Sequence, residues 1–530
     1  MMRTAQFRAL RQRLAVACLA ESRRMSTSRA IEQWHQRRTE GVDRRTFLSG
    51  LGAAAVAAAL PAERAAAQSN VRIAVIGAGL AGLACADRLH NRGVAATVYE
   101  AATRPGGRCW SLRQRFPGQV VERGGELIDN LHKTMIGYAR RFGLTLEDYE
   151  KQPGEVFYHF DGQAWAEHSV VDEYRAFVGA MRNDLHTLSA APTADSHQGG
   201  DVALDNTSLA EYLATRGAGP IVSKAIEAAY VAEYGLDVTE QSALNFLLFI
   251  HADRRSRFVP FGVFSDERYH VVQGNDRISE GLASALPSPV RYGHLLRRVA
   301  RLPDGRVQLT FTVENRSVTA SYDYVVLSLP FTVLRDVELA GSLQLPEWKR
   351  RAIAELGYGT NAKMMVGFDS AYWRDLGSSG ASYSDLPNHQ ATWETNPTGA
   401  TAAHAVLTGY YGGSRGASLD PNRVQNEASR FVGDVECVFR GANVHVARDR
   451  GNYRVHLEHW PSNPLAKGSY TCYRPGQFTT IAGNEGKRVD NLLFAGEHTN
   501  SFYEWQGFME GACLSGIDAA EEISGDLKKR

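Results

Sequence analysis

A glycine-rich turn between a short apolar run and a helix-like segment is the feature that most constrains the fold of this 530-residue chain. The run Val71–Ile76 is rich in β-branched residues, and Leu83–Leu89 has the apolar spacing of a helix. Between them, Gly77 permits a tight turn, Gly79 lets the backbone approach a pyrophosphate, and Gly82 allows the helix and strand to pack closely. This context predicts a Rossmann-like α/β domain with a parallel sheet that binds a dinucleotide.

The segment after the helix indicates which nucleotide fits. Val94–Tyr99 is expected to form the second strand, and it ends at Glu100, eighteen residues after Gly82. A carboxylate at this position accepts hydrogen bonds from a ribose hydroxyl and repels a 2′-phosphate, so NADP is disfavoured. The motif alone does not distinguish NAD from FAD.

The chain begins with a basic extension, 1–67. Its first 45 residues hold eleven arginines, four acidic residues and no lysine, and the apolar run Gly50–Leu60 follows. This layout predicts a secretory signal cleaved near Ala67, and the adjacent Arg44 and Arg45 resemble a twin-arginine signal. An alanine-rich anchor helix and a disordered tail are the alternatives. We therefore expect the twin-arginine translocase as a partner and a periplasmic or secreted location.

Other classes of protein are disfavoured by composition. The net charge is +1, so there is no basic field for nucleic acid and no nucleic-acid partner is expected. The cysteines form no C-x-x-C pair, so neither a zinc site nor a disulfide framework is predicted. His456 and His459 would face opposite sides of a strand, and no metal is expected.

Two further glycine segments accompany the first. Gly106 and Gly107 precede Arg108, a fixed cation that can neutralise a phosphate. Near the C-terminus, the apolar run 491–495 leads to Gly496 and Glu497, and residues 506–512 open a last helix.

In this order, the segments resemble the flavin-containing amine oxidases, a family that includes monoamine, polyamine and putrescine oxidases, from about Val71 to Ile523. The resemblance implies FAD as the cofactor. Some monoamine oxidases carry a flavin-bonded cysteine where this chain has Ser469, so non-covalent FAD is expected. The residues assigned to FAD by resemblance are Gly77, Ala78, Gly79, Leu80, Ala81, Gly82, Glu100, Gly106, Gly107, Arg108, Gly124, Gly125, Glu126, Leu296, Gly496, Glu497, Gly507, Phe508 and Met509.

Three residues are candidates for catalysis. Lys363 interrupts the apolar strand pattern 361–368; by itself this would suggest a strand-edge or snorkelling side chain. The resemblance implies instead that Lys363 holds a water against flavin N5. It also implies that Tyr470 and Phe508 form an aromatic cage that favours a small amine, whereas both could simply be core aromatics.

Two acids that follow the glycine pair Gly124 and Gly125 indicate the charge of the substrate. L-amino acid oxidases of this kind have an arginine there, whereas this chain has Glu126 and Asp129. Acids would repel a carboxylate and attract a second ammonium, so amines, including diamines and polyamines, are favoured. A helix cap or a hydrogen bond within the cofactor domain is the alternative for both. Trp505 is a further candidate for substrate contact.

The resemblance also implies how the chain is divided. A discontinuous FAD-binding domain is expected over 68–150, 269–330 and 485–525, with an interleaved α+β substrate domain of mixed sheet and helices over 151–268 and 331–484. The expected reaction is hydride transfer from an amine to flavin N5. It gives an imine and then an aldehyde or ketone plus ammonia or an amine, while O2 becomes H2O2.

Alternatives to this reaction remain open. The chain could be an L-amino acid oxidase, an amine dehydrogenase that uses an acceptor other than O2, a related C–C desaturase, or a flavoprotein without enzyme activity. A homodimer is compatible with the resemblance.

Overall fold

The computed structural model describes residues 71–149, 153–250, 268–397, 399, 403–500 and 505–529, together with Ala20, Met25 and Ser26. The export signal predicted around Arg44, Arg45 and the run Gly50–Leu60 lies outside the described residues. No helix in the described part of the chain combines the length and the apolar character needed to cross a bilayer.

A four-stranded parallel sheet forms the base of the predicted nucleotide site. Its order is β2-β1-β12-β21, and every neighbouring pair is parallel. The strands are β1 (Ile73–Ile76), β2 (Ala96–Tyr99), β12 (Tyr324–Leu327) and β21 (Leu492–Phe494). Strands distant in sequence thus form one sheet, which confirms the predicted α/β fold class.

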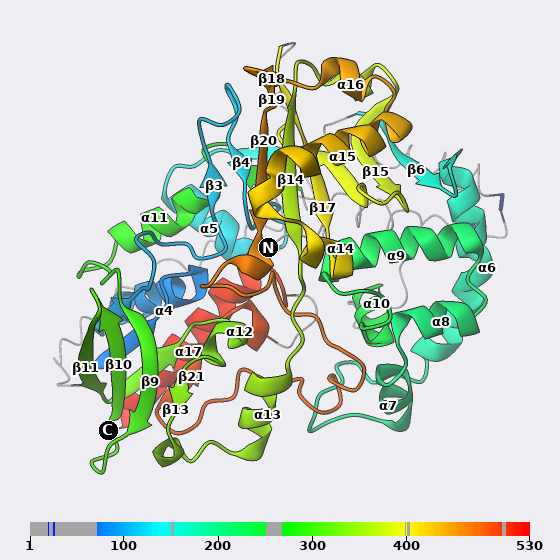
Figure 1. The fold of residues 1–530 in the computed structure, drawn as a ribbon. Coiled ribbons are helices and arrows are strands. Elements are labelled where there is room, and N and C mark those ends of the chain that lie inside the picture. The colour runs from blue at the N-terminus through cyan, green and yellow to red at the C-terminus, as the bar shows by residue number, and fades with distance from the viewer. Residues whose placement is uncertain are drawn as a thin grey trace, which may run out of the picture.

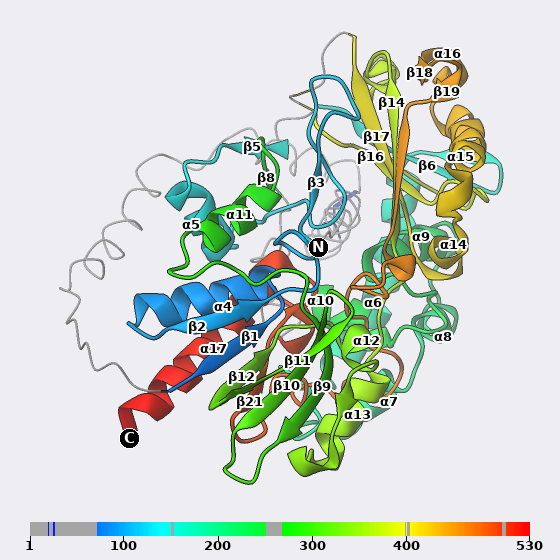
Figure 2. The same cartoon turned by 60° about the vertical axis from the view of Figure 1, so that its left-hand side comes forward.

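Two helices pack against each other beside this sheet. They are α4 (Leu80–Asn91), which follows the glycine turn, and α17 (Met509–Lys529), the last helix (Figure 2). A Cβ on Gly516 of α17 would meet the carbonyl oxygen of Ala81 at 2.0 Å, so glycine is required for this close approach. The helices α5 (Lys133–Arg141) and α11 (Asp276–Ser284) contact the same pair.

A second four-stranded sheet and three two-stranded ladders lie elsewhere in the described part of the molecule. The four-stranded sheet has the order β11-β10-β9-β13. Its strands are β9 (Leu295–Arg301), β10 (Val307–Val313), β11 (Arg316–Tyr322) and β13 (Glu338–Leu339). Three two-stranded ladders pair β3 (Ser111–Leu112) with β4 (Val121–Glu122), β5 (Leu146–Asp148) with β8 (Tyr269–Val271), and β18 (Arg448–Asp449) with β19 (Asn452–Tyr453).

A seven-stranded mixed sheet forms the other half of the molecule, in the upper part of Figure 1. Its order is β20-β14-β17-β16-β15-β6-β7, with β15 and β6 parallel and the other pairs antiparallel. The strands are β6 (Glu155–Phe160), β7 (Gln163–Trp165), β14 (Ala362–Phe368), β15 (Ser378–Ser384), β16 (Ala391–Glu394), β17 (Ala405–Tyr411) and β20 (Val455–His459).

Helices cover this sheet and continue the second half (Figure 1). They are α6 (Glu167–Leu185), α7 (Gly199–Asp205), α8 (Leu209–Thr215), α9 (Pro220–Tyr234), α10 (Ala243–Ile250), α14 (Gly413–Ser418), α15 (Val424–Val438) and α16 (Ala442–His445). Two short helices, α12 (Phe331–Leu334) and α13 (Glu347–Glu355), contact each other and lie beside β9 instead (Figures 1 and 2). The mixed sheet and its helices match the predicted α+β half, whereas the domain boundaries themselves stay a prediction.

Alternation along β14 decides which way its lysine points. Met364 and Val366 are fully buried in one core cluster with residues of α15, such as Phe431. Met365 packs instead with Phe116 and Val121, in a separate cluster. Because successive side chains of a strand point to opposite faces, Lys363 lies on the Met365 side, toward the segment that enters and leaves β4.

Candidate active site

The turn between β1 and α4 borders open space at a helix N-terminus. Gly77 has a φ of 105°, and a Cβ on Gly82 would meet the Gly77 carbonyl oxygen at 2.0 Å, so glycine is required at both. No described atom lies within 4 Å of the Cβ position of Gly79, the N-cap of α4, and no described side chain caps this helix. The free N–H groups at the start of α4 therefore border a space that a phosphate can enter.

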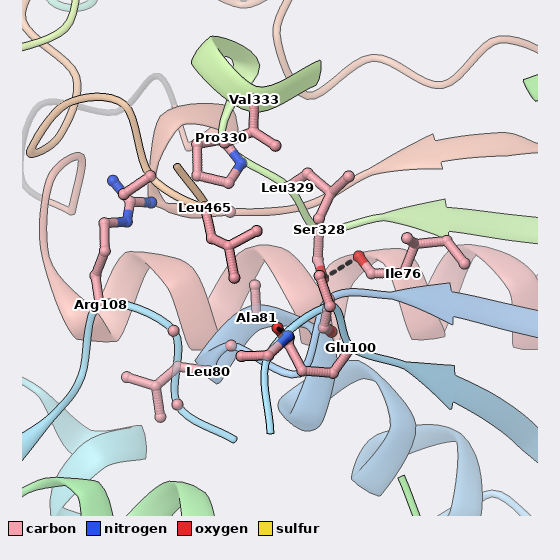
Figure 3. A pocket seen from close by; sticks show the side chains of 18 of the residues that line it. Ile76, Leu80, Ala81, Glu100, Arg108, Ser328, Leu329, Pro330, Val333 and Leu465 are labelled. Carbon is pink, nitrogen blue, oxygen red and sulfur yellow. Dashed lines mark hydrogen bonds between the residues drawn. The ribbon is translucent and has the colours of Figure 1, made fainter. Parts of the chain in front are cut away.

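One pocket collects most of the residues that were predicted to bind FAD (Figure 3). Its lining includes Gly77, Gly79, Leu80, Ala81, Glu100, Gly106, Gly107, Arg108, Leu296, Gly496, Glu497, Phe508 and Met509. Ala78 adjoins it, because its N–H donates to Glu100 Oε2 at 2.7 Å. Gly82 packs against the turn, and Gly124, Gly125, Glu126 and Gly507 are outside the lining of this pocket.

Arg108 connects segments that are distant in sequence at the wall of the pocket. Its Nη1 donates to Glu497 Oε1 at 2.9 Å and to the carbonyl oxygen of Ser469 at 2.6 Å. Only 16% of the Arg108 side chain and 2% of the Glu497 side chain are exposed. The glycine segment 106–107 and the segment 496–497 therefore meet through this ion pair.

Lys363 is buried at the centre of a hydrogen-bond cluster. Its Nζ donates to the carbonyl oxygens of Glu122 and Gly124, at 2.6 and 3.2 Å, and to Glu126 Oε2 at 2.7 Å. Trp393 donates its Nε1–H to Glu126 Oε1 at 3.0 Å. Burial lowers the pKa of Lys363 below its usual value, and the Glu126 carboxylate acts in the opposite direction.

A small cavity adjoins Lys363. Its lining consists of Arg108, Gly124, Lys363, Tyr410, Trp460, Ser469 and Tyr470. The Tyr470 hydroxyl lies 3.0 Å from the Tyr410 hydroxyl and also bonds to the carbonyl oxygen of Glu233. Arg108 and Trp460 line both this cavity and the large pocket, so the two spaces are neighbours.

Phe508 lies on the other side of this boundary. It is buried and lines the large pocket, and its ring centroid is 4.9 Å from that of His132. A Cβ on Gly507 would stand 3.8 Å from Tyr470 Cδ2, so the segment that carries Phe508 runs beside Tyr470. Trp505 is placed next to His132, with 5.6 Å between ring centroids.

The two acids predicted near the substrate are both buried. Glu126 bonds to Lys363 and Trp393, and Asp129 Oδ2 lies 3.2 Å from His132 Nε2. Neither acid, nor Trp505, is among the residues that line the large pocket or the small cavity. Their contact with a substrate stays a prediction, as do the catalytic roles of Lys363, Tyr470 and Phe508.

Sequence reasoning missed three aromatic residues of the site. Trp460 lines both spaces and donates its Nε1–H to the Arg123 carbonyl oxygen at 3.1 Å. Tyr410 meets Tyr470, and Trp393 holds Glu126. The sequence offered little indication of their role, because each lies in or next to an apolar strand, where aromatic residues usually pack in the core.

The donor set of the large pocket suits a flavin dinucleotide. Open space at Gly79 and the start of α4 fits a pyrophosphate, Arg108 supplies a cation, and Glu100 stands at the end of β2 to accept from a ribose. Residues from both ends of the described chain line this pocket, as a ligand with two extended halves requires.

A dinucleotide pocket that adjoins a buried lysine and an aromatic cavity defines a nucleotide-dependent α/β enzyme. The chain belongs to the flavin containing amine oxidoreductase family, whose model matches residues 80–524. It is therefore a flavin-dependent amine oxidoreductase, which confirms the family predicted from the sequence.

Curated relatives come from more than one branch of this family. A protein named putative L-amino-acid oxidase YobN, from Bacillus subtilis, is 25% identical over 87% of this chain and 96% of its own length. Lysine-specific histone demethylase 1 homolog 2 of Oryza sativa is 27% identical over 85% of this chain. The match spans only 56% of the length of that rice protein.

Solved structures share the fold. Cyclohexylamine oxidase from Brevibacterium oxydans has a TM-score of 0.72 at 21% identity, and the match covers 87% of this chain and all of the other. Putrescine oxidase bound to putrescine has a TM-score of 0.71 at 18% identity, covering 86% and 99%. At these identities the likeness is one of fold.

Proposed function

We propose that this chain oxidises a primary or secondary amine, with diamines and polyamines among the candidate substrates. The amine becomes an imine, which water converts to an aldehyde or ketone plus ammonia or a smaller amine, and O2 is reduced to H2O2. The observation that carries the proposal is the cavity beside the nucleotide pocket, where Lys363, Tyr410 and Tyr470 meet. FAD, when bound, supplies the hydride acceptor.

The aromatic residues of the cavity position the amine. The Tyr470 hydroxyl is held by Tyr410 and by a backbone carbonyl, so its ring keeps one orientation. Trp460 adds a second aromatic wall that reaches the nucleotide pocket. Such walls favour small amines, and their exclusion of water disfavours the charged, unreactive ammonium form.

Lys363 places a positive charge beside the cavity. Because three protein oxygens accept from its Nζ, it is held as an ammonium in a fixed position. A fixed cation stabilises negative charge that develops at the cavity wall.

An L-amino acid oxidase is the second candidate. Several relatives carry that name, including the Bacillus protein matched over 96% of its length. An amino acid needs a cation for its carboxylate, yet both cations among the described residues that line the small cavity are paired with acids, Arg108 with Glu497 and Lys363 with Glu126. This pairing favours an amine over an amino acid.

Anaerobic reduction of the flavin tests both candidates. The full-length protein, loaded with FAD, is mixed without oxygen with cyclohexylamine, putrescine, spermidine and a panel of L-amino acids. Loss of the yellow absorbance with an amine is expected. Loss with amino acids alone would establish the second candidate, and persistent colour with every compound would contradict both. The reduced flavin is then reoxidised either with O2, while H2O2 is measured, or with an artificial dye. A comparison of the two reoxidation rates tests whether O2 is the electron acceptor.

We also propose that FAD is held without a covalent bond. By resemblance, Ser469 corresponds to the position at which some monoamine oxidases have a flavin-bonded cysteine, and its hydroxyl bonds to Asn361 Oδ1. Acid precipitation of the holoprotein should leave FAD in the supernatant. Colour that stays with the pellet would show a covalent link.

Export through the twin-arginine translocase is the remaining proposal, and it rests on Arg44, Arg45 and the apolar run Gly50–Leu60. Cell fractionation of the native protein and of R44K/R45K, with mass measurement of the mature chain, tests it. The variant should remain unprocessed. Equal export of both forms would contradict the proposal.

A further inference from the structure

The buried lysine is paired with a carboxylate, Glu126, that lines neither the large pocket nor the small cavity. Glu126 Oε2 accepts from Lys363 Nζ at 2.7 Å, and only 1% of either side chain is exposed. We infer that Glu126 is the positioning residue of Lys363, held in turn by Trp393, and that this cluster keeps the lysine charged and in a fixed place beside the cavity. The inference rests on the proposed function.

The hydrogen-bond partners of Lys363 match the donors of an ammonium. An ammonium has three N–H donors and no acceptor. Lys363 Nζ has three oxygen partners in the segment 122–126, at 2.6, 3.2 and 2.7 Å. A neutral amine would direct its lone pair at one of these oxygens, so the arrangement fits the charged form.

Glu126 is distinguished from the other acids that face Lys363. Glu122 and Glu458 also lie near the ammonium. The carboxylate of Glu122 accepts from Ser111 and from the backbone N–H of Asn275, and that of Glu458 pairs with Arg123. Among the described residues, Glu126 is the acid whose carboxylate bonds to Nζ directly.

Trp393 completes the arrangement by using the second carboxylate oxygen. Its Nε1–H donates to Glu126 Oε1 at 3.0 Å, while Oε2 accepts from Lys363. Both partners are donors, so an amide in place of the carboxylate satisfies only one of them. Glu126→Gln is therefore a nearly isosteric change that breaks the cluster.

The chain contains a matched control on the same strand. Glu394 follows Trp393, is also buried, and accepts from Trp373 Nε1 at 2.8 Å and from Arg374 Nε at 3.1 Å. Neither Glu394 nor its partners line the small cavity. E394Q thus changes a buried glutamate with a tryptophan and a cationic partner, away from the site.

The first test follows flavin reduction by an active amine across pH. E126Q should slow the reduction at least tenfold and move its alkaline decline down by about one pH unit, because the lysine loses its counter-ion. E126D, which keeps the charge, should recover much of the rate. E394Q should have the wild-type rate and profile. A wild-type profile for E126Q would overturn the inference.

The second test does not depend on turnover. The thermal midpoints of the FAD-free proteins are compared for wild type, K363M, E126Q and K363M/E126Q. Because each single change leaves a buried group without its partner, the double variant should lose less than the sum of the two. Additive losses would overturn the inference. If no amine reduces the wild-type flavin, the proposed function fails while this coupling is still measured.

Discussion

Two clusters of similar chemistry include residues of the seven-stranded sheet, and they differ in their surroundings. The Glu126 cluster (Glu126, Lys363, Trp393) and the Glu394 cluster (Glu394, Arg374, Trp373) each join a buried glutamate to a cation and an indole N–H. Solvent reaches 38% of the Arg374 side chain but only 1% of Lys363. The Glu394 cluster thus joins β16 to the short helical turn Tyr372–Arg374, whereas the Glu126 cluster holds a charge inside the molecule beside a cavity.

The difference shows that composition does not identify a functional ion pair. A partly exposed cation keeps its hydration and contributes little beyond local packing. A fully buried cation has lost its hydration, so its position and charge depend on the protein groups around it. Variants that remove equivalent groups from each cluster test whether burial of the cation separates the two.

Removal of the cation should give the largest difference. Lys363→Met leaves Glu126 buried without its counter-ion, and loss of one partner of a buried pair costs about 3–5 kcal/mol of unfolding free energy. Arg374→Met should cost less, because the pKa of Glu394 is already raised by burial and the group can take up a proton. Urea denaturation of the FAD-free proteins measures both. Equal losses would contradict the distinction.

The pH dependence of stability should have opposite signs in the two clusters. Burial lowers the pKa of Lys363, so between this pKa and about 10.5 the unfolded chain binds more protons and stability rises with pH. Burial raises the pKa of Glu394 above 4.5, so the folded chain binds more protons there and stability falls as pH rises through that window. Each contribution is limited to about 1.36 kcal/mol per pH unit.

Difference curves isolate these contributions. The unfolding free energy of K363M subtracted from that of wild type should slope upward at alkaline pH, and the same subtraction for E394Q should slope downward above pH 4.5. Flat difference curves would contradict the shifts.

Removal of the indole donors should have a smaller effect. Trp393→Phe and Trp373→Phe each delete one hydrogen bond to a carboxylate, about 1.5–3 kcal/mol. Only W393F should also slow flavin reduction, several-fold, because Glu126 then holds Lys363 less firmly. Denaturation and single-turnover reduction are measured on the same samples. A slow W373F, or a W393F with the wild-type rate, would contradict the assignment.

The nucleotide pocket and the surroundings of Lys363 also differ in how much of each could be predicted from the sequence. The nucleotide pocket could be predicted, because Gly77, Gly79 and Gly82 report backbone requirements within a six-residue window. The pattern around Lys363 indicated a strand, and β14 is present at 362–368. The partner of Lys363 lies 237 residues away in sequence. Alternation defines the faces of a strand but not the segments that cover them, so this ion pair had no local signal.

The smallest effect is expected at the tyrosine pair, where two neighbours on β17 can be compared. The Tyr410 hydroxyl meets that of Tyr470 at 3.0 Å, whereas the Tyr411 hydroxyl donates to the Asn388 carbonyl oxygen at 2.9 Å, outside the cavity lining. Y410F and Y411F should each lose about 0.5–1.5 kcal/mol of unfolding free energy. Y410F should also raise the amine KM several-fold with little change in kcat, because the Tyr470 ring then positions the amine less well. The same KM change in Y411F would show that the effect belongs to the sheet, and an unchanged KM in Y410F would remove Tyr410 from the site.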